Sequence, residues 1–140
     1  MKSNELRIGN LVMCRGAIST ITIIQQKSIG YFKNSFVGED ALPLKFIKPI
    51  PLTEEWLVNF GFKEIKRFTH DFEEIIYGKS IIVGSENHCE TLVISMPFKT
   101  GFIGNYLSDE EYTLNIDINN VHQLQNLYFA LTNEELTLQS

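Results

Sequence analysis

Short runs of β-branched and aromatic residues, separated by Gly, Asn, Asp or Pro, fill most of the chain before residue 50. Such runs predict strands, because branched side chains pack well on a pleated surface and lose freedom in a helix. Turn residues between them favour antiparallel pairing in a small curled sheet or SH3-like barrel. We expect strands at residues 6–14 with a bend at Gly9-Asn10, at 17–24, at 29–33 and at 44–47.

Two prolines then interrupt this pattern. Pro49 and Pro51 exclude a helix interior, since each holds the residue before it in extended geometry. Thr53 can cap a helix that has two glutamates in its first turn, where the helix dipole favours negative charge. We expect a short helix over residues 54–60 that docks on the sheet, with Gly61 in the left-handed position after its end.

Glycines guide the predictions for the middle of the chain. Gly78-Lys79 lies between two apolar runs, as in a two-residue type II′ hairpin turn. Residues 91–96 predict a strand that ends before Pro97. Residues 97–111 are expected to form a loop, and the G-x-x-G string at 101–104 within it is expected to be a turn.

The last strand and the last helix have the clearest periodicity. Residues 113–118 alternate, so Leu114, Ile116 and Ile118 are expected to face a core. Apolar residues at helical spacing then predict an amphipathic helix from 121 to 131. Asn119-Asn120 can cap its start, Asn133 can take the left-handed position after its end, and Leu136 and Leu138 could staple the tail onto the core.

These elements predict one α+β domain over residues 1–140, mainly antiparallel, in which an SH3-like part and a short central helix precede a C-terminal helix packed on the sheet. We divide it into a basic β-rich half at 1–52 and an acidic α+β half at 53–140. Residues 1–70 carry ten basic and six acidic residues, a balance of +4, whereas residues 71–140 carry two and eleven, a balance of −9. Such a split can steer association with charged partners or with a second copy.

The start of the chain and its cysteines suggest a cytoplasmic protein. No apolar run follows Lys2, so no signal peptide is expected, and no stretch reaches the length of a membrane span. Cys14 and Cys89 are far apart and form no C-x-x-C pattern. We expect both to be reduced thiols, with a single disulfide as the alternative.

We find no residue pattern that predicts catalysis, a cofactor or a metal site. Nucleophile-elbow, zinc-protease and Walker strings are absent. The acidic stretch around His70 is interpreted as a polar strand end, and His88-Cys89-Glu90 lacks partners at zinc-ligand spacing. His122 is expected on the helix surface or at its cap, and the carboxylates at 109–111 in a solvated loop. A Cys–His pairing of Cys14 or Cys89 with a distant histidine stays open.

Basic and aromatic residues are the better candidates for a partner-binding surface. Cations interleaved with aromatic rings in the N-terminal part could bind phosphates and stack bases, and two aromatics of the 97–111 segment could add contact area. The candidate residues are Arg7, Arg15, Lys27, Tyr31, Lys33, Lys45, Lys48, Phe102 and Tyr106.

Three strings together resemble a family of small uncharacterised proteins of Bacteroidetes phages and prophages. They are LRIGNLV at 6–12, PIPLTEEWL at 49–57 followed by FGF at 60–62, and VHQLQNLYFALT at 121–132. The family usually has glycine where Asn133 stands, which agrees with a left-handed position there. The resemblance implies a context in which small acidic accessory proteins bind host or phage proteins, as anti-CRISPR proteins do.

The sequence therefore favours a non-enzymatic accessory protein that binds and modulates a host macromolecule, such as a CRISPR effector or another nucleoprotein. The alternative is a nucleic-acid-binding module that uses the basic N-terminal face, whose binding would weaken steeply with salt. A homo-oligomer and an enzyme are further alternatives, and no membrane partner is expected.

Overall fold

The computed structural model describes residues 1–24, 28–33, 39–69, 72–83, 88–96, 99–104 and 111–139. Contacts group the chain into two compact units. Unit 1 comprises Met1–Pro51 and Asn120–Tyr128, and unit 2 comprises Leu52–Asn119 and Phe129–Ser140. The first boundary thus falls in the proline-containing segment. The prediction of a single domain over the whole chain stays a prediction.

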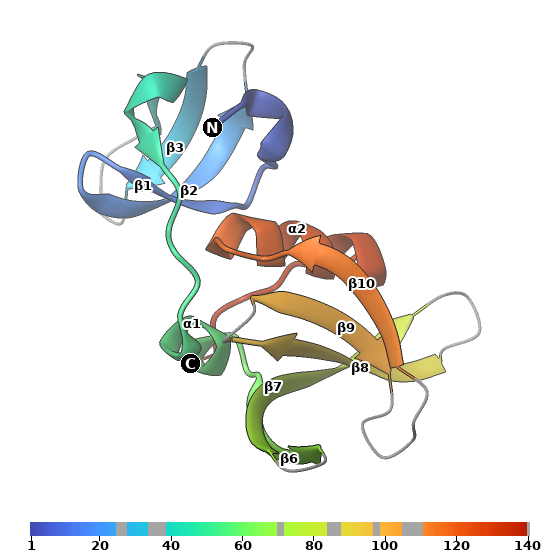
Figure 1. The fold of residues 1–140 in the computed structure, drawn as a ribbon. Coiled ribbons are helices and arrows are strands. Elements are labelled where there is room, and N and C mark those ends of the chain that lie inside the picture. The colour runs from blue at the N-terminus through green and yellow to red at the C-terminus, as the bar shows by residue number, and fades with distance from the viewer. Residues whose placement is uncertain are drawn as a thin grey trace. The chain divides into compact units, whose positions relative to one another are not determined.

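Unit 1 is built on an antiparallel sheet of five strands in the order β4-β3-β2-β1-β5 (Figure 1). Each strand pairs with its neighbour in the chain, except that β5 returns to pair with β1. The elements are the 3-10 helix η1 at Ser3–Glu5, β1 at Leu11–Cys14, β2 at Ala17–Ile24, β3 at Ser28–Lys33, β4 at Glu39–Pro43, the 3-10 helix η2 at Leu44–Phe46 and β5 at Ile47–Lys48.

Two of the four strand predictions in this unit are confirmed, as β2 and β3. The predicted strand at 6–14 begins only at Leu11, because Gly9 adopts φ +92° in a turn that precedes it. The strand predicted at 44–47 is wrong, since its first three residues form η2 and the pairing strand β4 lies earlier. The strand order is compatible with an SH3-like arrangement, which stays a prediction.

Apolar side chains from all five strands form the core of unit 1. Two side chains outside the strand centres also belong to this core. Leu6, which precedes β1, is buried, and Ile24, at the end of β2, is partly buried. Cys14 is buried among them as a free thiol, and burial raises its pKa more than a hydrogen bond with Ser19 lowers it. The buried members are Leu6, Val12, Cys14, Ile21, Ile29, Leu42 and Ile47.

The helix α2 at Val121–Thr132 contributes its first turns to unit 1. At its start the backbone N–H of Asn120 donates to Gln123 Oε1 over 3.0 Å, as in one half of a capping box. The predicted cap by an asparagine side chain stays a prediction. Gln125 is buried and uses both ends of its amide: Oε1 accepts from the Leu11 N–H at 2.8 Å, and Nε2 donates to the Gly9 carbonyl at 3.3 Å. One side chain of the helix thus satisfies two backbone groups at the entry to β1.

The next helix residue continues the same network. Asn126 Oδ1 accepts from Asn10 Nδ2 at 2.9 Å, and Asn126 Nδ2 donates to the Glu5 carbonyl at 2.9 Å. Asn10 is fully buried, and its Oδ1 accepts from the Arg7 N–H at 2.8 Å. The irregular segment between η1 and β1 is therefore held by side-chain amides in addition to the backbone hydrogen bonds of Gly9 and Asn10 with Ile21 of β2.

Unit 2 contains a second antiparallel sheet of five strands, in the order β10-β9-β8-β7-β6 (Figure 1). All of its neighbours in the sheet are neighbours in the chain, so it is a simple meander. The elements are α1 at Glu54–Asn59, β6 at Lys63–Thr69, β7 at Phe72–Val83, β8 at His88–Ser95, β9 at Thr100–Gly104 and β10 at Glu111–Asp117.

The short central helix is confirmed. Thr53 is the N-cap, with its side chain accepting from the Trp56 N–H at 3.4 Å, and Gly61 follows the helix with φ +83°. Leu57 and Phe60 are fully buried, and the ring centroids of Trp56 and Phe60 lie 5.6 Å apart. Local capping signals alone were enough to locate this helix, because its ends are fixed by the residues next to them.

The predicted hairpin at Gly78-Lys79 is wrong. Strand β7 runs without interruption from Phe72 to Val83, and Gly78 pairs with Lys63 on one side and Val93 on the other. Glycine is required there for packing, because a Cβ at residue 78 would come within 2.7 Å of Ile65 Cδ1. The sequence alone does not reveal that a side chain of the neighbouring strand β6, that of Ile65, packs over this glycine.

The loop predicted over 97–111 and the turn predicted at its G-x-x-G string are also wrong in part, because Thr100–Gly104 forms β9 and pairs with β8. Residues 105–110 lie outside the described part. In β10 the register shifts between Thr113 and Asp117. Within this irregularity Ile116 is 44% exposed, which corrects the predicted core position, whereas Ile118, beyond it, is fully buried as predicted. The side chain of Leu114 lies outside the description.

The end of the chain follows the predictions in part. Asn133 has φ +57°, as expected of the residue that ends a helix in the left-handed region. Leu136 is buried, and the Gln139 N–H donates to the Asn59 carbonyl at 2.7 Å. Leu138 is exposed, so only one of the two leucines staples the tail.

The amide network gives a first prediction. Gln125→Ala should lower the free energy of unfolding by about 1–3 kcal/mol, because two partly buried backbone groups lose their partner. Chemical denaturation of both chains measures the difference. Gln139→Ala is the control, since that side chain is exposed and the recorded hydrogen bond of Gln139 uses its backbone. Equal losses in the two variants would contradict the role assigned to Gln125.

Gly78 gives a second prediction. Gly78→Ala should destabilise the fold by about 1–3 kcal/mol, because the new methyl group would overlap Ile65 Cδ1. Ile65→Val removes that atom, so the cost of Gly78→Ala should fall in the Ile65→Val background. A double-mutant cycle of unfolding free energies measures this coupling. If the two changes are simply additive, the close packing of Ile65 on Gly78 is not what requires the glycine.

Candidate binding surface

The structure locates four of the nine candidate residues completely. Lys27 and Tyr106 lie outside the described residues. Tyr31 and Lys33 lie in β3 and Phe102 lies in β9, but their side chains are outside the described part. The remaining candidates are Arg7, Arg15, Lys45 and Lys48.

Three of these four gather at one end of the β1–β5 pair. Met13 pairs with Lys48 and Cys14 pairs with Ile47, so Arg15 follows the last pair on one strand. On the other strand the last pair is preceded directly by η2, whose middle residue is Lys45. Because partner Cα atoms of antiparallel strands lie only about 4.5–5.5 Å apart, this register brings the three cationic residues into one neighbourhood. All three are exposed.

The backbone at this end is set by two tight elements. Arg15 and Gly16 have φ +49° and +79°, so they form a two-residue turn of the type I′ kind between Cys14 and Ala17. Opposite it, η2 follows Pro43, which has φ −57° and ψ 141°. These short, hydrogen-bonded connections leave the two ends little freedom and present their side chains outward.

An aromatic side chain completes the group. Phe46 is 52% exposed, and Lys45 Nζ lies 5.0 Å from its ring centroid. That contact is a cation–π pair, which holds the ammonium group over the ring face. We call Arg15, Lys45, Phe46 and Lys48 the basic–aromatic patch. The sequence analysis missed Phe46, although its position between two lysines was a signal that could have identified it.

Arg7 does not belong to this patch. It precedes β1, whereas Arg15 follows it, so the two arginines lie beyond opposite ends of that strand. Arg7 is half-buried, and its backbone N–H donates to Asn10 Oδ1. Because Asn10 in turn bonds to Asn126 of α2, Arg7 belongs to the amide network that holds this segment, which indicates a structural role for this arginine.

The patch can bind anionic groups and flat rings. It combines three exposed basic side chains with a partly exposed aromatic ring. Arginine and lysine bind phosphate and carboxylate oxygens through charge-assisted hydrogen bonds, and an exposed ring offers a stacking surface. It contains no group that could act as a nucleophile or a general base at neutral pH.

The histidine, cysteine and carboxylate candidates do not converge in the described part of the chain. Within those ranges no three His, Cys, Asp or Glu side chains form a metal-binding group. His70 and Asp71, like residues 109–110, lie outside them. Glu73 and Glu74 form ion pairs with Lys66 at 3.5 Å and Arg67 at 3.3 Å across the β6–β7 pair. Cys89 is an exposed free thiol, and the side chain of His88 is not described.

His122 differs from its prediction. It was expected on the helix surface or at the helix cap, but it is only 3% exposed, and its Nδ1 has no hydrogen-bond partner among the described residues. Burial lowers its pKa below the ordinary 6.5, while the Glu5 carboxylate raises it by a smaller amount and the N-terminal ammonium lowers it. The buried face of α2 is therefore wider than the apolar face that the spacing of its leucines predicts, because it also includes His122.

His122 gives a third prediction, on pH. Because its pKa is lowered in the folded chain, the unfolded chain binds the proton more tightly, so stability is lost as the pH falls from the unfolded pKa through the folded one. His122→Leu removes this group. Its unfolding free energy should fall less than that of the parent chain between about pH 7.5 and about pH 5.5.

Denaturant titrations at several pH values measure both slopes. Every other titratable group is shared by the two chains, so the difference isolates residue 122. Identical slopes would show that His122 has the same pKa in the folded and unfolded chains.

Comparison with known proteins finds no family model, no curated protein and no solved structure that matches the chain. Nor do the described ranges contain a helix with the length and apolar character needed to cross a membrane.

Proposed function

We propose that this protein is a non-enzymatic accessory protein of the phage or prophage type, which binds and modulates a host macromolecule through the basic–aromatic patch. The observation that carries the proposal is the exposed ring of Phe46 beside three exposed basic side chains on one end of the β1–β5 pair.

The composition of the patch supports a contact role. Aromatic residues and arginine are enriched at the centres of protein interfaces, where a ring buries large area at little entropic cost. A phenylalanine left half in water forgoes burial worth about 1–2 kcal/mol, and a partner surface could recover it. The turn and the 3-10 helix that present these side chains are already formed, so binding would order little backbone.

The charge of the patch supports a partner with an anionic surface. Protein surfaces of complementary charge associate faster and more selectively than neutral ones. RNA-guided defence nucleases are nucleoproteins that carry such surfaces, and the resemblance to phage and prophage proteins supports a search among them. An inhibitor of the anti-CRISPR kind is the specific form of this proposal.

A nucleic acid is the second candidate, which the cation–π pair of Lys45 and Phe46 favours. A single strand could stack a base on the ring while neighbouring cations contact its phosphates. The net negative charge of residues 71–140 repels a long polyanion and so opposes nonspecific binding. We therefore expect a short stretch of nucleic acid to be bound at the patch, rather than a long one along the surface.

A fourth prediction tests the protein partner. A tagged copy, expressed in a Bacteroidetes host, should co-purify with a stoichiometric partner, and the double variant Arg15→Gln/Lys48→Gln should lose at least about tenfold in affinity for it. Lys2→Gln is the matched control, because it removes an exposed cation outside the patch. Unchanged affinity of the double variant would show that the patch is not part of the interface. The absence of any partner would contradict the proposed function.

Fluorescence anisotropy with labelled single-stranded DNA and RNA separates the two candidates. If a nucleic acid is the partner, binding should weaken steeply with salt, and Phe46→Ala should reduce it at every salt concentration. No binding at low salt would exclude the second candidate and leave the first untouched.

A further inference from the structure

Among the described strands, none lies beside the outer edge of β6. This strand ends the order β10-β9-β8-β7-β6, and all 7 of its residues pair with β7 without a shift of register (Figure 1). Its sequence contains no proline. A long, regular edge of this kind presents a row of backbone N–H and C=O groups with which another strand can form hydrogen bonds.

The other described edges of the two sheets are shorter or irregular. β5 has 2 residues and is followed by Pro49, and β4 ends at Pro43. In β10 the register shifts between Thr113 and Asp117. Short strands, prolines and irregular register all oppose the addition of a further strand. Since β6 has none of these protections, it is the described edge best suited to pairing with another chain.

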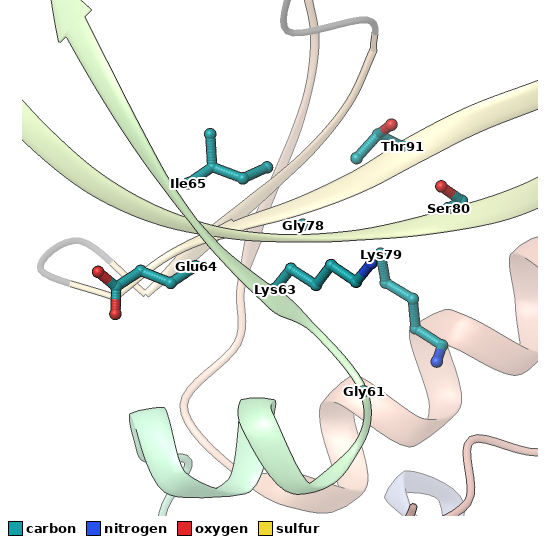
Figure 2. A pocket seen from close by; sticks show the side chains of 8 residues that line it. All are labelled: Gly61, Lys63, Glu64, Ile65, Gly78, Lys79, Ser80 and Thr91. Atoms are coloured by element: carbon teal, nitrogen blue, oxygen red, sulfur yellow. The ribbon is translucent and has the colours of Figure 1, made fainter.

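An apolar row crosses the sheet of unit 2 and stops at this edge. Ile76 and Val93 are fully buried, and Ile65 of β6 packs against them although it is only partly buried itself. Ile65 pairs directly with Ile76, so the two side chains share one face of the sheet. Ile65 also leans across Gly78, beside which Figure 2 shows it. A further strand beside β6 could complete the burial of Ile65.

The charges at this edge balance one another. The basic side chains are Lys63, Lys66 and Arg67, and the acidic ones are Glu64, Glu73 and Glu74. Two ion pairs already join β6 to β7, at 3.5 and 3.3 Å. An edge without net charge favours a neutral strand over a strongly acidic or basic one, and the same edge of a second copy of this chain is neutral in the same way.

Symmetry and charge select one register for a second copy. Two identical antiparallel strands related by a two-fold axis have one residue that faces its own equivalent. If Glu64, Lys66 or Arg67 held that position, two like charges would be directly opposed. Registers centred nearer either end of β6 would pair fewer residues.

Centring the pair on Ile65 avoids this repulsion. The two isoleucines then meet on the axis, and the apolar row continues from one sheet into the other. Glu64 of each copy lies opposite Lys66 of the other copy, on the same face. Both residues are exposed, and Figure 2 shows Glu64 and Ile65 on different sides of the β6 ribbon, as alternation requires.

The remaining pair and an exposed ring fit the same register. Lys63 would lie opposite Arg67, whose charge is offset by Glu74 of its own chain at 3.3 Å. Phe68 is 77% exposed, the largest fraction among the large apolar side chains of the described part. It would lie diagonal to Glu64 of the second copy, within reach of an aromatic side chain, so pairing would remove part of the ring from water.

We propose that β6 forms an antiparallel pair with β6 of a second copy of this chain, centred on Ile65, so that the two sheets join into one. This contact goes beyond the proposed function, because it concerns unit 2 and uses none of the patch residues. Interfaces of less than about 1,200 Å² are typically weak or transient, and a single strand pair is a small contact. The dimer is therefore expected to be in reversible equilibrium with single chains.

Sedimentation velocity of the full chain tests this pairing, at concentrations up to about 1 mM because the interface is small. The weight-average mass should rise with concentration from that of one chain toward that of two. Glu64→Lys should weaken dimerisation at least about tenfold, because it places like charges opposite each other at two points of the interface. The double variant Glu64→Lys/Lys66→Glu should restore dimerisation, because the facing charges are again opposite in sign.

Glu134→Lys is the matched control, since it makes the same charge change at an exposed residue outside the sheet. Glu64 and Lys66 are exposed, so the fold should be retained, and far-UV circular dichroism of each variant verifies this. Three results overturn the proposal: a mass that stays at one chain or passes two, equal weakening by Glu64→Lys and Glu134→Lys, or a double variant that dimerises no better than Glu64→Lys alone.

Discussion

The amide side chains of Gln125 and Asn126 hold the segment that leads into β1, and unit 1 depends on this interaction. The Leu11 N–H and the Gly9 carbonyl, both partly buried, bond to Gln125 rather than to a neighbouring strand. Asn10 extends the network and also bonds through its own backbone to Ile21 of β2. The helix therefore fixes where the sheet begins, although it lies more than 110 residues later in the chain.

Both candidate sites arise where regular pairing stops. The basic–aromatic patch is presented by a tight turn and a 3-10 helix at the end of the β1–β5 pair. The proposed contact between two copies uses the outer edge of β6, where the strand order of the second sheet ends. At such ends side chains and backbone groups are exposed without a neighbouring strand, so binding surfaces are concentrated there. The interior of each sheet supplies the rigidity that positions them.

Local signals predicted much of the fold. Thr53 and Gly61 bracket α1, β2 matches its β-branched run, and Asn133 ends α2, because each depends on residues close in sequence. The failures share one cause, which is dependence on distant neighbours. Gly78 is needed by Ile65 on another strand, and the burial of His122 follows from what packs against α2. Of the patch, the sequence analysis named the three cations but could not show that β1–β5 pairing groups them with Phe46.

The division of the chain between the two units has a consequence for its biosynthesis. Unit 1 opens the chain and takes its last contribution from Asn120–Tyr128, while unit 2 is likewise closed by Phe129–Ser140. A ribosome releases the chain in order, so the amides that secure the first strand emerge more than 110 residues after the segment they hold. The nascent N-terminal strands must therefore wait, without their polar partners, until the segment that contains Gln125 and Asn126 has been translated.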